Sequence, residues 1–341
     1  MTERSRSVTL RDVAARVGVT TAAVSMALSD TGRIGVETKQ RIRDAAAELG
    51  YVPSSAGRAL RKRRSDAIAV IVPATTHHVF GHMYFMHVLT GVSSVTNEHG
   101  AQLLISTDSD EAGGVSAYER VLGSRSADGA LVTSAAIGDP NVERLATSGL
   151  AVVLIGSFPE FPDAASVWID DVAASRGAAE HLIRVHGRQR LVHVTGPLDH
   201  QSGADRLAGF RAAVDAAGIG DAALVLEGDF SEQSGTDAAE RSLEAGADGG
   251  VFANDDMAFG AMTALRARGI DIPGRISVCG FDDFGIARLT SPALTTVHVP
   301  AEELARTATE RLFALLDGRP APDITTLPTD LRVRESCGCG V

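Results

Sequence analysis

The sequence predicts a small all-α unit at the N-terminal end, followed by a larger two-lobed α/β core with parallel sheets. The chain has 341 residues, enough for two or more domains of about 150 residues. Residues 8–50 show helical periodicity, whereas from residue 67 short β-branched runs alternate with amphipathic stretches, as in repeated βα units. The charge balance also changes at this place. Residues 1–65 carry 13 Lys and Arg against 6 Asp and Glu, whereas residues 66–341 carry 19 Lys and Arg against 37 Asp and Glu.

The N-terminal unit is expected to form three short helices. Residues 9–12 have the residue types of a capping box, and Gly18 separates the first helix from a second one around Val24. A third helix is expected over about residues 37–49. With the small Ala14 at the crossing, this spacing is typical of a helix-turn-helix, whose second helix can enter the major groove of DNA. An ordinary helical hairpin is the alternative, and the basic surplus favours DNA binding.

The core is expected to contain eight strands with helices between them. The strand candidates are residues 67–72, 102–107, 129–133, 151–155, 191–195, 223–227, 249–253 and 276–281. Eight strands are many for one doubly wound sheet, so two lobes of similar size, crossing near residues 168–170, fit the length better. A (β/α)₈ barrel is the structural alternative, because the strand count permits it.

Polar residues follow several of these strands, where open α/β folds bind ligands. Asp170, Asn254 and Asp282 each follow an apolar run, and Arg206 lies near the start of the helix after residues 191–195. In a two-lobed core this edge of the sheets faces the cleft. The sequence therefore predicts a polar ligand site between the lobes.

Several motifs resemble the lactose-repressor and purine-repressor (LacI/GalR) family. They are VTLRDVA at residues 8–14, GVTTAAVS at 18–25, ETKQRI at 37–42, ELGYVP at 48–53, NDDMAFG at 254–260, SVCGFDD at 277–283 and RVRESCG at 332–338. The resemblance covers essentially the whole chain. It implies a homodimeric transcription regulator, most simply a repressor, that binds a pseudo-palindromic operator under the control of a small-molecule effector.

The resemblance also implies a domain organisation. Residues 1–53 would form the helix-turn-helix head, residues 54–65 a hinge helix, and residues 66–341 a core similar to the periplasmic sugar-binding fold. Within the core, the first lobe would comprise about residues 66–168 plus a crossover near 290–325. The second lobe would comprise about residues 169–289 plus a C-terminal strand.

DNA contacts are implied for the head and the hinge. The expected DNA-binding residues are Thr9, Thr20, Thr21, Ala22, Ser25, Met26, Arg33, Ser54, Arg58 and Leu60. The leucine matching Leu60 wedges into the minor groove in relatives, and an apolar side chain can indeed unstack and kink a base step. Many relatives have an arginine where this chain has Met26, and methionine cannot make arginine's paired hydrogen bonds to guanine. We therefore expect a different operator preference at that position.

Effector contacts are implied for the core. The expected effector-binding residues are Tyr84, Phe85, Asp170, Arg206, Phe230, Asn254 and Asp282. Phe230 matches an aromatic residue that stacks on the effector in relatives, and Tyr84 and Phe85 match a second aromatic contact. Carboxylate, amide and guanidinium groups suit neighbouring sugar hydroxyls, so a sugar is expected, with a nucleobase or nucleoside as the alternative.

A structural role is the alternative for these residues, with the aromatic rings in the core and the acids as helix caps. Each expected acidic site residue stands in a pair or run of acids, and we expect Asp171, Asp256 and Asp283 to be the caps.

Other functions are disfavoured. No phosphate-binding loop, nucleophile elbow or HExxH pair occurs, so we expect no enzyme and no cofactor. A scattered catalytic set is the remaining route to an α/β enzyme. A solute-binding transport protein would need a secretory signal, which residues 1–7 lack. A cytoplasmic protein is therefore expected. Residues 67–97 contain no charged Asp, Glu, Lys or Arg, but their polar interruptions favour a strand and a helix over a membrane span.

No metal site is expected. Cys337 and Cys339 have no second cysteine pair to complete one. The histidines at positions 77, 78, 82 and 87 could bind zinc or nickel, but no carboxylate or cysteine joins them at a regular spacing.

Overall fold

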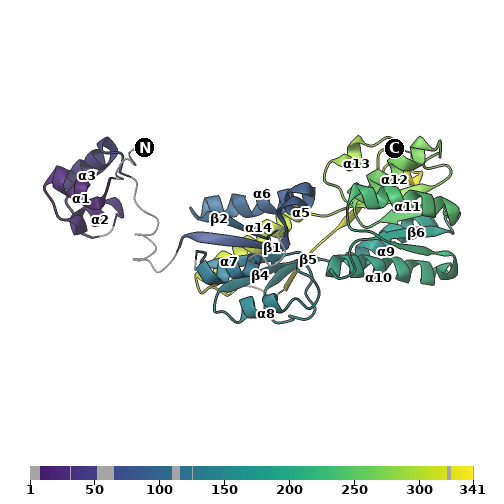
Figure 1. Ribbon diagram of the computed structural model, residues 1–341, viewed down its shortest axis with the longest axis horizontal. Coiled ribbons are helices and arrows are strands. Elements are labelled where there is room, and N and C mark those ends of the chain that lie inside the picture. The colour runs from purple at the N-terminus through teal and green to yellow at the C-terminus, as the bar shows by residue number, and fades with distance from the viewer. Residues whose placement is uncertain are drawn as a thin grey trace. The chain divides into compact units, whose positions relative to one another are not determined.

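The computed structural model describes residues 8–30, 32–51, 65–109, 116–124, 126–320 and 324–340 (Figure 1). The expected hinge residues Ser54, Arg58 and Leu60 lie outside these ranges, as do the side chains of His77 and His78. The chain divides into two compact units, Met1–Ser65 and Asp66–Val341.

The first unit contains the three expected helices, α1 (Leu10–Val17), α2 (Thr21–Leu28) and α3 (Val36–Glu48). Val13, Val24 and Ile42, one from each helix, are fully buried against one another in a single apolar cluster. The turn between α1 and α2 passes through Gly18 with a left-handed φ of 77°, which glycine adopts without strain. The helices thus form a compact helix-turn-helix pair backed by a third helix.

The first lobe of the second unit is built on a six-stranded parallel sheet in the order β11-β5-β4-β3-β1-β2. Its strands are β1 (Ala67–Thr75), β2 (Gln102–Asp108), β3 (Gly129–Thr133), β4 (Ala151–Ile155), β5 (Ser166–Ile169) and β11 (Ile324–Leu327). Its helices are α5 (Thr76–Gly81), α6 (Met83–Glu98), α7 (Ala117–Ser124), α8 (Pro140–Ala146) and α14 (Ala301–Leu316).

Both faces of this sheet are covered. Ile68 and Val70 of β1 point into a core shared with α6 and α14, whereas Ala69 and Ile71 point into a core shared with α7 and α8. This alternation explains why β1 contains a continuous apolar run, since every side chain of a strand that is covered on both faces is buried. Helices α6 and α14 cross closely at Gly91, where an added Cβ would lie 2.3 Å from a backbone carbonyl oxygen of α14.

The second lobe repeats the plan with the strand order β12-β10-β9-β8-β6-β7, in which only β12 is antiparallel. Its strands are β6 (Leu191–Thr195), β7 (Leu224–Glu227), β8 (Gly249–Phe252), β9 (Ser277–Asp282), β10 (Thr295–His298) and β12 (Asp330–Arg332). Its helices are α9 (Asp171–Arg184), α10 (Gln201–Ala216), α11 (Glu232–Glu244), α12 (Asp255–Ala267) and α13 (Ile286–Leu289), with 3₁₀ turns η1 (Gly220–Ala222) and η2 (Glu335–Cys337).

The chain passes between the lobes three times, after β5, after β10 and after β11. Two separate sheets overturn the barrel alternative. The return to the first lobe, expected near residues 290–325, begins after His298, because β10 still pairs with β9. The apolar stretch at residues 67–97 forms β1, α5 and most of α6. Within the described ranges, the helices fall short of the length and apolarity needed to cross a membrane.

Candidate functional site

The outward face of α2 is the candidate reading surface of the head. Thr20 caps this helix, since its Oγ1 accepts a hydrogen bond of 3.2 Å from the backbone N–H of Ala23. Thr21 and Ala22 are exposed, and 39% of the Met26 surface is accessible to solvent. Ser25 lies between them, and its hydroxyl is buried with no hydrogen-bond partner among the described residues. This face therefore offers small, hydroxyl and thioether groups rather than charge.

The expected residues outside α2 have different surroundings. The backbone N–H and hydroxyl of Thr9 both donate to a carboxylate oxygen of Asp12 at 2.7 Å, which fixes the start of α1. Arg33 is exposed. Two further arginines of the basic head hold its fold together, since Arg41 donates to the carbonyl of Val17 at 3.2 Å and Arg43 pairs with a carboxylate at 3.1 Å.

A cavity of about 540 Å³ lies between the two lobes of the second unit. Both lobes contribute to its walls: Tyr84 and Trp168 come from the first lobe, and Arg206 and Phe230 from the second. Among the residues expected to bind effector, those that line it are Tyr84, Phe85, Arg206, Phe230, Asn254 and Asp282. The structure thus brings together six side chains that span almost 200 positions of the sequence.

Asp170 is the exception. Its Oδ1 accepts a hydrogen bond of 2.9 Å from the backbone N–H of Ala173, which makes it the N-cap of α9, and it does not line the cavity. The next residue, Asp171, lies inside instead and is only 7% exposed. The expected roles within this acidic pair are therefore reversed, because the helix starts at Asp171, one residue earlier than a cap at Asp171 would require.

Asn254 and Asp283 also differ from expectation. Asn254 caps α12, because its Oδ1 accepts from the N–H of Met257 at 2.9 Å, while its Nδ2 donates to the carbonyl of Phe230 at 2.8 Å. Its amide thus fixes the loop that carries Phe230. Asp283 is no helix cap. It is 8% exposed and accepts a hydrogen bond of 2.6 Å from Arg334.

Arg206 is the electrostatic centre of the cavity. Its Nε donates to Asp171 at 2.7 Å, another nitrogen lies 3.8 Å from an oxygen of Asp282, and its guanidinium carbon lies 3.8 Å from the centre of the Phe281 ring. Burial opposes the charge, yet the two carboxylates hold the pKa of Arg206 above its usual value. Burial conversely raises the pKa of Asp171, and that of Asp282 well above its usual range. The buried guanidinium of Arg206 is consequently compensated within the protein.

Aromatic rings flank this polar centre. The ring of Phe230 lies directly over the backbone of Gly196, where an added Cβ would come 2.0 Å from the ring. Across the cavity, the hydroxyl of Tyr84 is 3.2 Å from that of Thr133. Phe85 touches the cavity but is only 4% exposed and belongs mainly to the core of the first lobe. The result is a slot with polar groups at its edge and apolar faces beside them.

The backbone around the cavity is strained. Ser134, Phe230 and Asp282 line it with φ values of 55°, 68° and 118°, in the left-handed region that favours glycine. Such conformations cost about 1–3 kcal/mol each and persist where a function requires them. Their gathering at one cavity supports a binding role.

Sequence reasoning missed contacts that connect the lobes. His82 lines the cavity, and its Nδ1 lies 3.6 Å from a carboxylate oxygen of Asp256, which was expected only as a cap. His87 stacks on Phe284 with ring centres 4.7 Å apart. These histidines belong to the cluster noted in the sequence, and in the described structure they pair with the opposite lobe.

Comparison with known proteins agrees with this architecture. A family model described as bacterial regulatory proteins, lacI family, matches residues 9–54, and a periplasmic binding protein-like domain matches residues 179–337. The chain is 33% identical to the HTH-type transcriptional regulator CelR of Thermobifida fusca, over 98% of this chain and 99% of CelR. It is 32% identical to the HTH-type transcriptional regulator AscG of Escherichia coli (strain K12), over 91% of this chain and 92% of AscG.

Solved structures are similar as well. A CelR–cellobiose complex has a TM-score of 0.72 at 31% identity, covering 96% of this chain and 99% of the other. A lac repressor dimer bound to operator and the anti-inducer ONPF has a TM-score of 0.86 at 24% identity, covering 97% and 99%, which shows a shared fold. Helix-turn-helix head, two-lobed core and whole-length similarity together show that the chain belongs to the LacI family of DNA-binding transcriptional regulators.

Proposed function

We propose that this protein is a homodimeric repressor that binds a pseudo-palindromic operator and changes its operator affinity when a neutral sugar binds between the lobes. A ligand that touches both lobes stabilises one arrangement of them over another. A coupling free energy of about 1–3 kcal/mol would change operator affinity by roughly 5- to 150-fold. Such a regulator acts in the cytoplasm, where the operator is.

The compensation of Arg206 supports a neutral effector. Asp171 and Asp282 already neutralise this buried guanidinium, so a phosphorylated ligand would find no unpaired cation among the described polar groups that surround it. Sugar hydroxyls, by contrast, can both donate to carboxylates and accept from guanidinium without adding charge. The volume of about 540 Å³ lies within the roughly 300–1,000 Å³ typical of ligand pockets.

A disaccharide of glucose is the first effector to test. CelR, the relative at 33% identity, has a solved complex with cellobiose. Phe230 would stack on one face of a pyranose ring, with Tyr84 on the opposite wall, as apolar sugar faces pack on aromatic rings. Asp282 and Arg206 would contact hydroxyls at the ring edge.

In the head, we assign operator reading to the exposed face of α2. Thr20, Thr21, Ala22 and Met26 would face base edges, with Thr9 and Arg33 on phosphates, whereas Ser25 would reach DNA only after its buried hydroxyl turns outward. For the hinge we keep the sequence-based assignment of Ser54, Arg58 and Leu60 to the operator centre. Phosphate contacts supply affinity and salt dependence, whereas contacts to base edges supply specificity.

Footprinting tests the DNA-binding part. The full-length protein is mixed with DNA from upstream of its own and adjacent genes, at two salt concentrations. We expect a protected palindrome that weakens with salt, because Lys and Arg displace counterions from phosphates. Absence of protection with and without cell extract, which would supply a corepressor, contradicts the proposal.

The effector part is tested on the same operator by fluorescence anisotropy, with cellobiose, glucose, glucose 6-phosphate and adenosine. A neutral sugar should change operator affinity in either direction, and Arg206→Ala should abolish the response while operator binding persists. Arg211→Ala is the matched control, since Arg211 lies on the same helix but is exposed. An unchanged response in Arg206→Ala removes Arg206 from the site, and a response to the phosphate or to adenosine alone refutes the neutral sugar.

A further inference from the structure

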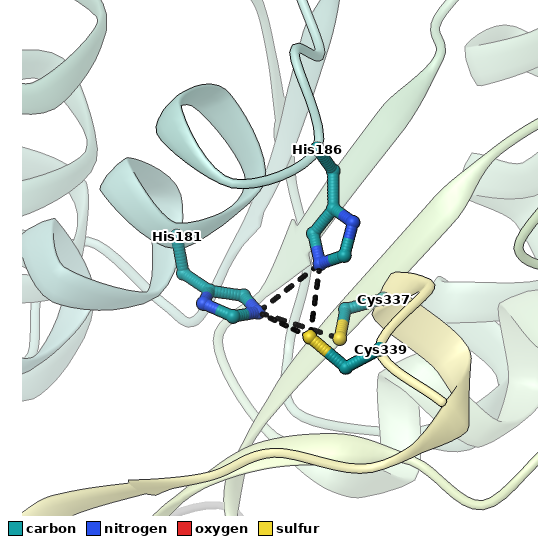
Figure 2. A group of neighbouring side chains, drawn as sticks. All are labelled: His181, His186, Cys337 and Cys339. Carbon is teal, nitrogen blue, oxygen red and sulfur yellow. Dashed lines mark hydrogen bonds between the residues drawn. The ribbon is translucent and has the colours of Figure 1, made fainter. Parts of the chain in front are cut away.

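Four metal-ligating side chains meet at the far end of α9, in the second lobe (Figure 2). His181 lies in the last turn of α9, and His186 follows two residues after the helix ends. Cys337 ends η2, and Cys339 follows it. The two pairs are about 150 positions apart in the sequence, yet their four ligand atoms all lie within 4.8 Å of one another.

Four of the six separations between the ligand atoms are close to the edges of a coordination tetrahedron. The two histidine Nε2 atoms are 3.3 Å apart, and His181 Nε2 lies 3.4 Å from the sulfur of Cys337 and 3.7 Å from that of Cys339. His186 Nε2 lies 3.4 Å from the sulfur of Cys339. Tetrahedral zinc with Zn–N and Zn–S bonds of about 2.05 and 2.3 Å requires roughly 3.3 Å between nitrogens and 3.6 Å from nitrogen to sulfur.

Hydrogen bonding alone does not account for this arrangement. A neutral imidazole nitrogen is either a donor of one proton or an acceptor through one lone pair. The Nε2 of His181 nevertheless faces three partners, namely His186 and both sulfurs. One cation at the centre would satisfy all four groups at once.

The backbone holds both thiols in place. The carbonyl of Cys337 accepts a hydrogen bond of 2.6 Å from the hydroxyl of Ser277 on β9. Gly338 between the cysteines has a left-handed φ of 110°, and an added Cβ would lie 3.0 Å from Nδ1 of His186. Glycine adopts this conformation without strain and leaves room for the turn that directs both sulfurs toward the histidines. A site built from such an anchored segment loses little freedom when it binds a metal.

We propose that His181, His186, Cys337 and Cys339 bind one structural Zn²⁺ ion. Two nitrogen and two sulfur ligands in a tetrahedron are a set that zinc prefers, and four protein ligands leave no open position for catalysis. The His-x₄-His spacing also lies within the range found in zinc sites. Two thiolates balance the charge of the ion, and binding releases the two thiol protons.

The ion would fasten the C-terminal segment to the end of α9, whose other end carries Asp171 about 15 Å away along the helix. The metal would thus hold the helix that positions Arg206, and this role does not depend on which effector binds.

Metal content tests the proposal directly. The full chain without a histidine tag is reduced, loaded with Zn²⁺, freed of excess metal by gel filtration and assayed by mass spectrometry. We expect about one zinc per chain, as in closed structural sites. His186→Gln and Cys339→Ser should lose it, whereas His99→Gln and Cys279→Ala, outside the cluster, should retain it. Circular dichroism confirms that each variant is folded.

Cobalt substitution reports the ligands themselves. Co²⁺ in a tetrahedral site with two thiolates gives visible ligand-field bands and a sulfur-to-cobalt charge-transfer band, which should be absent in Cys339→Ser, because that variant no longer holds the metal, and should persist in Cys279→Ala. Zinc should also raise the melting temperature of the wild-type chain but not of Cys339→Ser. Substoichiometric zinc after loading, equal retention in the cluster and control variants, or an intact mass showing a Cys337–Cys339 disulfide in the reduced, zinc-loaded sample would overturn the proposal.

Discussion

Asp255→Asn is expected to remove a pH dependence from the stability of the core. Asp255 begins α12 and is only 3% exposed. One carboxylate oxygen accepts the N–H of Asp283 at 2.8 Å, and the other accepts the hydroxyl of Thr296 at 2.6 Å. Burial raises its pKa to about 7, although both hydrogen bonds oppose this. An asparagine has the same shape and can accept from Asp283 while its amide faces Thr296.

The sign and the size of the pH dependence that Asp255 gives to the free energy of unfolding follow from proton linkage. An unfolded Asp has a pKa of about 3.9, so between that value and about 7 the folded chain holds a proton that the unfolded chain has lost. The stabilisation from this group is complete below pH 3.9 and is lost as the pH rises toward 7, by about 1.4 kcal/mol per unit. Between pH 5 and pH 8 the loss is roughly 2–3 kcal/mol, and most of it occurs below pH 7.

Urea unfolding, followed by circular dichroism at several pH values, measures this loss of stability. The free energy of unfolding of the wild-type chain minus that of Asp255→Asn should fall by the stated amount from pH 5 to pH 8. Any constant cost of the substitution leaves this slope unchanged. Asp256→Asn, the next residue on α12 with a side chain one-third exposed, is the control and should keep the wild-type slope. Parallel curves for wild type and Asp255→Asn would refute the reasoning.

Three further experiments test other parts of the structure. Selection of bound sequences from random DNA should show a weak preference for guanine opposite Met26. In Met26→Arg the free-energy preference for guanine over the other bases should increase by about 1–3 kcal/mol. A strong guanine preference in the wild type would contradict this expectation. Gly196→Ala should displace the ring of Phe230, which its Cβ would meet at 2.0 Å, and weaken effector binding at least about tenfold, measured by calorimetry; unchanged affinity would place the effector elsewhere. Gly91→Ala, whose Cβ would meet a carbonyl at 2.3 Å, should cost about 1–3 kcal/mol in urea unfolding, whereas Gly123→Ala, with open space around it, should gain up to about 1 kcal/mol.

The central strands of both lobes could be predicted from sequence to the residue, for example residues 129–133, 151–155 and 191–195. These strands are mostly buried, so each is a short, largely apolar run of β-branched and aliphatic residues. The strand at residues 295–298 was missed because it is short and no amphipathic helix precedes it. The strand at residues 324–327 was missed because its exposed, threonine-rich edge carries little apolar signal.

The candidate site was predictable only in part. Arg206 could be placed because polar residues that follow parallel strands share one edge of a sheet. Asp170 and Asp171 could not be told apart, since a shift of one residue in the helix start exchanges a cap for a buried partner of Arg206. The histidines that join Cys337 and Cys339 lie in another part of the chain, and only tertiary structure brings them near. A search of the sequence for a second cysteine pair therefore does not reveal this site, because its other two ligands are histidines.

The threefold passage of the chain between the lobes also constrains how the protein is made. The first sheet receives its edge strand β11 only at residues 324–327, and the second receives β12 only at residues 330–332. Helix α14, which covers the first sheet, follows β10 of the second. On the ribosome, where domains that are continuous in sequence fold one after another, neither lobe can be finished until its own edge strand, within residues 324–332, has emerged. The two lobes are therefore completed almost together, and a chain that stops before residue 324 would contain neither.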